Sequence, residues 1–155
     1  AVSDIVGLEW SKFATWVGMV VLSVVVRSAS WHFLADPVSA TVLVRLTREM
    51  GRLAQALDIH LSDNGMLPAA GLCMGSEEEA VAVVTKAGRD LRERTPDHRM
   101  SSLQDLDAGR PLEIHETLGY ALQKAASCGV SMPVLDAFYR LIATAEKVRD
   151  SGTKG

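Results

Sequence analysis

A valine-rich apolar run constrains the fold of this chain more than any other stretch. The run covers residues 17–26, Val-Gly-Met-Val-Val-Leu-Ser-Val-Val-Val, and lies between Lys12 and Arg27. A membrane-spanning helix needs roughly 20 apolar residues, so the run is too short to cross a bilayer. It also follows Asp4 and Glu9, which are wrong for a secretory signal. We therefore expect a buried central helix, with a buried strand as the alternative because valine is so frequent.

Helical periodicity extends over most of the remaining sequence. One apolar stripe advances in steps of 3 and 4 residues, which places it on a single helix face: Leu43, Leu46, Met50, Leu53 and Leu57. The same reasoning predicts helices over residues 6–26, 38–57, 76 to shortly before Pro96, 101–108, 112–128, and from 133 to at least 148. No stretch shows the apolar–polar alternation of a strand. The predicted fold class is all-α.

Local signals mark several helix ends. Ser76 with Glu79 three residues later forms a capping box. Gly129 supplies a left-handed cap, and Pro133 is favoured in a first helical turn. In the last segment the predicted apolar face repeats at steps of 4 and 3: Val134, Phe138, Leu141, Ala145 and Val148.

Composition fits one globular domain. The chain has 155 residues, 48% of them apolar, which is enough for a substantial core. Its net charge of −3 gives no reason to expect a nucleic-acid surface. Two cysteines, Cys73 and Cys128, are too few for a disulfide framework, so we expect reduced thiols in a cytoplasmic protein.

The motifs of nucleotide and metal sites are missing from the sequence. No G-x-G-x-x-G spacing occurs, and Gly71 and Gly75 precede a helix without the Gly-Lys-Ser/Thr of a phosphate loop. His115-Glu116 begins like a zinc protease helix, but Gly119 stands where the second histidine must be. The other histidines share no ligand spacing. We expect neither a bound dinucleotide nor a metal ion in this chain.

A stretch in the second half of the chain carries a family pattern. The residues 101–105, Ser-Ser-Leu-Gln-Asp, are followed by Gly109-Arg110 and by Leu112-Glu-Ile. This pattern resembles the signature of the helical C-terminal domain of the ketopantoate reductase (2-dehydropantoate 2-reductase) family, which is related to the helical domain of 6-phosphogluconate dehydrogenase. Residues 9–14 and 129–133 resemble other segments of that domain. The resemblance implies one such domain over residues 1–150. We also expect a frayed tail over 151–155 and, because the glycine motif is missing, no nucleotide-binding domain.

The resemblance implies two catalytic residues. Lys12 matches the family's general acid, and Glu113 matches the glutamate that contacts the substrate and helps to set that lysine. A hydride arriving at a ketone carbon leaves negative charge on oxygen, which an ammonium both neutralises and protonates. Without the resemblance, Lys12 is a lysine at the rim of an apolar helix. Glu113 is then a carboxylate in a first helical turn, favoured by the helix dipole.

Three further residues are implied to hold the substrate. Ser101 matches the family serine that binds the substrate carboxylate, although with Gln104 it also fits a capping box. His98 falls near a position sometimes held by a substrate-binding asparagine. Trp16 and Val20 stand where the family has two asparagines, on the same helix face as Lys12. We expect Trp16 to line the cleft and ketopantoate to be disfavoured, because a polar substrate loses its partners there.

The sequence thus predicts the substrate-binding and catalytic helical domain of a 2-dehydropantoate 2-reductase-like, NADPH-dependent oxidoreductase of pantothenate biosynthesis, acting on a 2-keto acid. NADPH would be held by a Rossmann-type domain that this sequence does not include. The alternative is a stand-alone helical binding or dimerisation module without catalysis. We expect a cytoplasmic homodimer with no membrane partner, contacting its second copy through residues 1–8, Trp10, Trp16 and Trp31, because an isolated domain exposes apolar surface.

Overall fold

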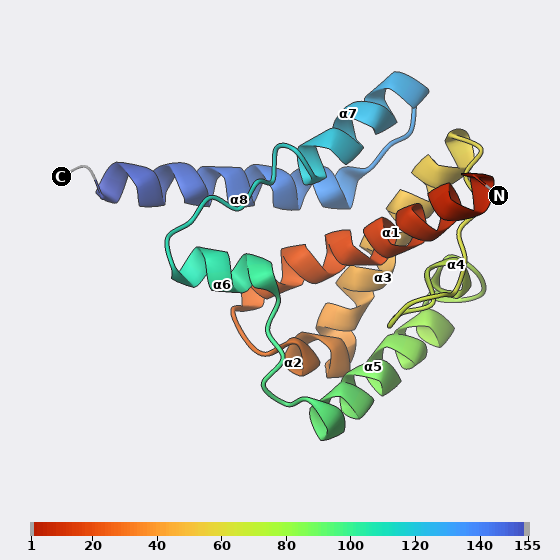
Figure 1. Cartoon of the computed structure of the whole chain (residues 1–155), viewed down its shortest axis with the longest axis horizontal. Helices are drawn as coiled ribbons and strands as arrows, with labels where there is room; N and C mark the ends of the chain where they lie inside the picture. The colour runs from red at the N-terminus through yellow and green to blue at the C-terminus, as the bar shows by residue number, and fades with distance from the viewer. Residues whose placement is uncertain (1, 154–155) are drawn as a thin grey trace.

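Residues 2–153, the part of the chain that this computed structural model describes, contain eight helices and no strand (Figure 1). In chain order the helices are α1 (Val2–Val26), α2 (Ser30–Ala35), α3 (Pro37–Ala56), α4 (Ala69–Leu72), α5 (Glu77–Arg94), α6 (Ser101–Asp107), α7 (Leu118–Cys128) and α8 (Pro133–Gly152). The predicted all-α class is confirmed. Within the predicted tail, α8 continues to Gly152, and residues 154–155 lie outside the described part.

The pair α1 and α3 forms the centre of the fold. Both helices contact α2, α4 and α8, while α6 packs on α1 and both α5 and α7 pack on α3. In Figure 1, α7 and α8 lie on one side of this pair, and α2 and α5 lie on the other. Gly18 allows the close approach of the two central helices, because a Cβ there would stand only 3.0 Å from Leu43 Cγ.

The valine-rich run is buried as predicted over residues 17–23. Its last two residues differ from the prediction, since Val25 is 51% and Val26 is 44% exposed. By length and composition alone, α1 could cross a membrane over Asp4–Val26, but half of this segment is buried inside the structure. A core helix of a soluble protein passes the same test, so this property is only weak evidence for a membrane span.

The core has two parts that meet at α1 and α3. One part joins them to α7 and α8 through side chains such as Met50, Leu118 and Leu135. The other joins them to α2, α4 and α5 through side chains such as Phe33, Leu72 and Val84. The predicted stripe on α3 is confirmed, with its first four members fully buried and Leu57 half-buried.

The helices α2 and α4 were not predicted, because six and four residues are too short to show a periodic pattern. Their place is set by tertiary contact. The backbone of α2 comes so close to α5 that a Cβ on Gly88 would lie 2.4 Å from the backbone nitrogen of Ala35. A glycine is therefore required for this crossing.

The segment predicted as a helix over 112–128 is helical only from Leu118. Residues 112 and 113 have no regular secondary structure and residues 114–117 form a turn instead, and Glu113 has a left-handed backbone with φ of 56°. The Leu112 amide donates to Glu146 Oε1 of α8 at 3.0 Å, and both Leu112 and Ile114 are buried in the core. The interpretation of Glu113 as a first-turn carboxylate is therefore wrong, because packing of its two neighbours overrides the helical pattern.

The ends of the helices follow the local signals well. The Ser76 capping box is present, with the Glu79 amide donating to Ser76 Oγ at 3.1 Å. Gly129 is left-handed with φ of 68°, and Pro133 is the first residue of α8. The predicted apolar face of α8 is wrong in part, since Leu141 and Val148 are each 66% exposed. The buried residues of α8 are Leu135 and Ile142.

Candidate functional site

A cavity of about 210 Å³ lies beside the middle of α1. It is closed by two segments far along the chain, the loop before α4 and the loop before α6. Three of the five site residues predicted from the sequence line it: Lys12, Trp16 and His98. The other lining residues are Ser11, Thr15, Met19, Asn64, Gly65, Met66, Leu67 and Met100. The wall is mostly apolar, with the lysine as its one cationic side chain.

Lys12 is the cationic residue of this lining. Its side chain is 58% exposed, and Nζ lies 3.4 Å from Glu9 Oε1, one helical turn earlier. An exposed pair of this kind is worth at most about 1 kcal/mol, so it leaves the ammonium free to turn toward an anion. Lys12 is thus a cation beside an apolar hollow, which is an arrangement that attracts a small organic acid.

The Trp16 side chain is half-buried one turn further along α1. Its ring lies 6.2 Å from that of Phe13, which in turn lies 6.5 Å from the ring of Tyr120 on α7. Val20, the other residue that stands where the family has asparagine, is buried. Of these residues only Trp16 lines the cavity, where it joins Met19 as an aromatic and aliphatic surface beside Lys12.

His98 reaches the cavity from the loop between α5 and α6. This loop is tied to the start of α2 by two hydrogen bonds to one residue. The Ser30 amide donates to the His98 carbonyl at 2.8 Å, and Ser30 Oγ lies 2.9 Å from His98 Nδ1. Ser30 is fully buried, so it holds the exposed imidazole in one orientation.

Ser101 does not line this cavity, although the preceding residue, Met100, does. It is the exposed first residue of α6, and the predicted capping box with Gln104 is not formed, because the cap position is taken by Met100. The next serine is the buried one: Ser102 Oγ is hydrogen-bonded to Ser23 Oγ of α1 at 2.9 Å. Sequence reasoning missed this pair, which fixes α6 against α1.

Glu113 also lies outside the lining of this cavity. Its side chain is exposed, and its carboxylate has no hydrogen-bond or ion-pair partner within residues 2–153. A left-handed backbone at a residue other than glycine is uncommon, costs free energy, and occurs often at functional sites. The left-handed turn leaves the Glu113 side chain exposed between the buried Leu112 and Ile114.

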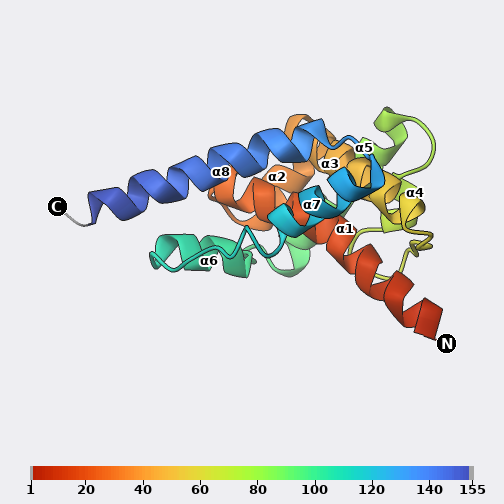
Figure 2. The same ribbon diagram turned by 90° about the horizontal axis from the view of Figure 1, so that it is seen from above.

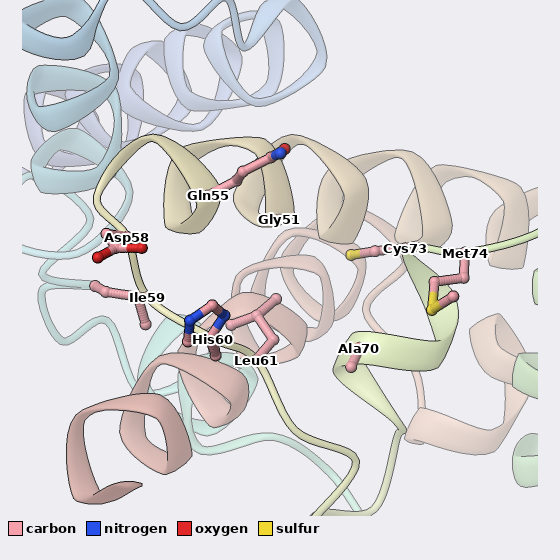
Figure 3. A pocket seen from close by; sticks show the side chains of 9 residues that line it. All are labelled: Gly51, Gln55, Asp58, Ile59, His60, Leu61, Ala70, Cys73 and Met74. Atoms are coloured by element: carbon pink, nitrogen blue, oxygen red, sulfur yellow. The ribbon is translucent and has the colours of Figure 1, made fainter. Parts of the chain in front are cut away.

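A second and larger cavity, of about 420 Å³, lies between α3 and the two loops around α4 (Figure 3). Figure 3 shows the sulfur atoms of Cys73 and Met74 at one end and Asp58 at the other, with His60 between them. The remaining lining residues are Gly51, Gln55, Ile59, Leu61 and Ala70. None of the predicted site residues lines this cavity, and its one thiol has a pKa raised by burial. The smaller cavity is therefore the candidate site.

The described residues do not fit a dinucleotide. Pyrophosphate binds at helix N-termini with free amides, but carboxylates occupy the starts of three long helices here. Asp36 accepts from the Val38 amide at α3, three glutamates crowd the first turn of α5, and Glu49 accepts amides at α8. Among residues 2–153 no cluster of His, Cys, Asp or Glu could hold a metal ion.

The comparison with protein families decides what this helical domain is. The sequence matches the ketopantoate reductase PanE/ApbA C-terminal family over residues 4–146. The chain belongs to this family. The resemblance seen in the sequence is therefore confirmed, together with the helical fold that it implied.

A solved structure supports the same fold. The structure of a dimeric ketopantoate reductase from Staphylococcus aureus, studied for kinetic cooperativity, has a TM-score of 0.65 and 18% sequence identity to this chain. The match covers 90% of this chain and 42% of that one. The chain thus spans less than half the length of that enzyme. No curated protein sequence matches the chain.

Proposed function

We propose that this chain is the substrate-binding, proton-donating half of a 2-dehydropantoate 2-reductase-like oxidoreductase. Its substrate class is a small 2-keto acid whose side chain is apolar. The observation that supports this most directly is the convergence of Lys12, Trp16 and His98, from two distant segments, on one cavity. NADPH, the cofactor of full-length members of the family, would be held by another domain.

The chemistry of the cavity fits a keto acid. The Lys12 ammonium would attract the substrate carboxylate. It would also neutralise the charge that develops on the carbonyl oxygen during reduction and then donate a proton to that oxygen. His98, held by Ser30, would donate or accept one hydrogen bond at the far wall. The volume of about 210 Å³ suits a small organic acid rather than a drug-sized molecule.

The apolar floor of the cavity argues for a substrate without a side-chain hydroxyl. Ketopantoate carries such a hydroxyl, which needs a polar partner when it is buried. Trp16 offers only an indole N–H donor and Met19 offers only a weakly accepting sulfur, and a buried hydroxyl that is left unpaired costs roughly 1–3 kcal/mol. We therefore expect the chain to prefer 3,3-dimethyl-2-oxobutanoate, which differs from ketopantoate only by lacking this hydroxyl.

The test is a titration of the 155-residue chain with these two acids, followed by amide and indole NMR shifts. We expect 3,3-dimethyl-2-oxobutanoate to shift the Trp16 indole signal and to bind roughly tenfold tighter than ketopantoate, which is the factor for about 1.4 kcal/mol. Lys12→Gln should weaken binding by a similar factor. Lys86→Gln, which changes another exposed lysine on α5, should leave it unchanged.

The second candidate function is a helical binding or dimerisation module without catalysis. The apolar residues at the two asparagine positions favour it, since they remove polar contacts that the family uses. Under this alternative neither acid binds at the cavity, and Lys12→Gln behaves like Lys86→Gln. In both cases we expect no tight NADPH binding by the chain alone, which calorimetric titration would measure.

A further inference from the structure

The cavity lined by Lys12, here the Lys12 cavity, adjoins a second hollow of about 510 Å³ on α5. Four residues of α5 line this hollow: Ala87, Asp90, Leu91 and Arg94. At roughly 100° per residue they fall within an arc of about 100°, so one face of the helix forms the wall. Ala87 and Leu91 are half-buried and make the apolar part of this wall, while Asp90 and Arg94 make its polar part.

The two hollows meet at the loop between α3 and α4. Within residues 2–153, only Gly65 and Met66 of this loop line both of them. Because glycine has no side chain, Met66 contributes the one side chain that is common to the two linings. Met66 therefore stands between the Lys12 cavity and the hollow on α5.

The loop backbone is held on both sides of Met66, while the Met66 side chain is not. Before it, the Ser62 amide donates to Oγ of the buried Ser11 of α1 at 2.8 Å. After it, Leu67 is only 4% exposed and packs in the core. Figures 1 and 2 show this loop beside the N-terminal half of α1. Met66 is 53% exposed, and methionine is unbranched and flexible, so its side chain can be displaced while the loop stays in place.

This arrangement relates the length of a bound acid to one side chain. The Lys12 cavity, at about 210 Å³, is filled by a small acid whose carboxylate lies at Lys12. A longer alkyl chain outgrows that volume, and each further methylene group gains free energy only where it leaves water for apolar surface. Such surface lies on the far side of Met66, at Ala87 and Leu91. The chain reaches it when the Met66 side chain moves aside.

We propose that Met66 determines the chain length of the 2-keto acid that this domain accepts. Its side chain closes the Lys12 cavity toward α5 and so favours a short acid. Removing that side chain opens a subsite on Ala87 and Leu91, whose ligand is the alkyl tail of a straight-chain 2-keto acid. The inference rests on the proposed function, because it takes the acid to be held at Lys12.

Calorimetric titration of the wild-type chain and of Met66→Ala with 2-oxohexanoate and 2-oxooctanoate tests the proposal. In the wild type the longer acid should bind no more tightly than the shorter one. In Met66→Ala each added methylene group should tighten binding roughly fourfold, the factor for burying one CH₂. The small acid 3,3-dimethyl-2-oxobutanoate should bind both chains equally. Met74→Ala, at a methionine that is 71% exposed and lines the larger cavity, should keep the wild-type preference.

Amide NMR shifts locate the tail. With 2-oxooctanoate, Met66→Ala should show shifts at Leu91 and Thr95, which line the hollow on α5. Shifts at Leu8 and Leu61 instead would place the tail in the hollow by the start of α1 and would overturn the proposal.

The same chain-length preference in the wild type and in Met66→Ala would also overturn it. If the small acid still shifts the Trp16 indole signal in that case, the proposed function stands and only the role of Met66 fails. If no acid binds to either chain, the proposed function and the role of Met66 both fail.

Discussion

The carboxylate of Glu49 accepts the backbone amide of Leu135 at 2.9 Å, and its other oxygen accepts the Val134 amide at 2.8 Å. Glu49 lies on α3 and is only 2% exposed. The residue before α8, Met132, has no side chain that could cap the helix, and Pro133 has no amide to satisfy. A glutamate from a helix 85 residues earlier therefore caps α8.

Replacing Glu49 should destabilise the domain strongly. Glu49→Ala leaves the buried amide of Leu135 and the partly buried amide of Val134 without acceptors, and we expect a loss of about 2–4 kcal/mol in the free energy of unfolding. Glu49→Gln keeps one acceptor oxygen and should lose about half of that. Urea denaturation measures both. The control is Glu78→Ala, on the exposed side of α5, which should change stability by less than about 0.5 kcal/mol. Equal losses for Glu49→Ala and Glu78→Ala would show that the cap is unimportant.

The contact between α2 and α5 predicts a large effect for a single methyl group. Gly88→Ala would place a Cβ at 2.4 Å from the backbone of Ala35, so the two helices must move apart. Overpacking of this kind costs about 1–3 kcal/mol, which exceeds the gain of about 1 kcal/mol in helix propensity. Gly152→Ala is the matched control, because nothing lies within 4 Å of a Cβ at that position in α8. Thermal unfolding should separate them, with Gly88→Ala melting lower than wild type and Gly152→Ala not lower.

The two thiols should differ in reactivity. Burial raises the pKa of the Cys73 thiol, against the opposing influence of Arg48 and Arg52, whereas Cys128 is exposed. A raised pKa lowers the thiolate fraction at neutral pH, and the thiolate is the reacting form. With a chromogenic disulfide reagent, Cys128→Ser should react more slowly than Cys73→Ser at pH 7–8. The rate of the Cys128→Ser variant, in which only Cys73 remains, should also rise at higher pH. Equal rates in the two variants would contradict this prediction.

The ion pair between Arg45 and Glu77 should give a measurable pH dependence. Arg45 Nε donates to Glu77 Oε2 at 2.9 Å, and this hydrogen bond lowers the pKa of the Glu77 carboxyl. The stabilising contribution is therefore present above the unfolded value of about 4.3 and is lost as pH falls through the lower folded value. An NMR titration should show Glu77 titrating below its ordinary range in the wild type and near it in Arg45→Gln. If the Glu77 pKa were the same in Arg45→Gln as in the wild type, the hydrogen bond from Arg45 could not be the cause of its lowering.

Most of the helical fold could be predicted from the sequence. The stripe on α3, the Ser76 capping box and the Gly129 cap all depend on residues close together in the chain. Local periodicity and cap chemistry carry such information directly. The family pattern at residues 101–114 can also be recognised without knowing any tertiary contact, because it is a pattern of residue types.

The candidate site was predictable only in part. Lys12 and Trp16 share a helix face, so their proximity follows from spacing alone. His98 joins them only because it is hydrogen-bonded to Ser30, which lies 68 residues earlier in the chain. Nothing in the sequence near His98 predicts this contact. The start of α7 was also predicted wrongly because it depends on distant residues. The Leu112 amide donates to Glu146, and Leu112 and Ile114 are buried in the core, so residues 112–114 do not join the helix.

The sequence by itself determined the helical class, the family and the position of the lysine, because these follow from short-range spacing and residue type. Only the tertiary structure decided which apolar stripes are covered. The stripe on α8 has the same 3–4 spacing as the stripe on α3, yet α3 is enclosed by six other helices while Leu141 and Val148 face outward. Periodicity shows that a helix has an apolar face, but only the packing of distant segments determines what that face meets.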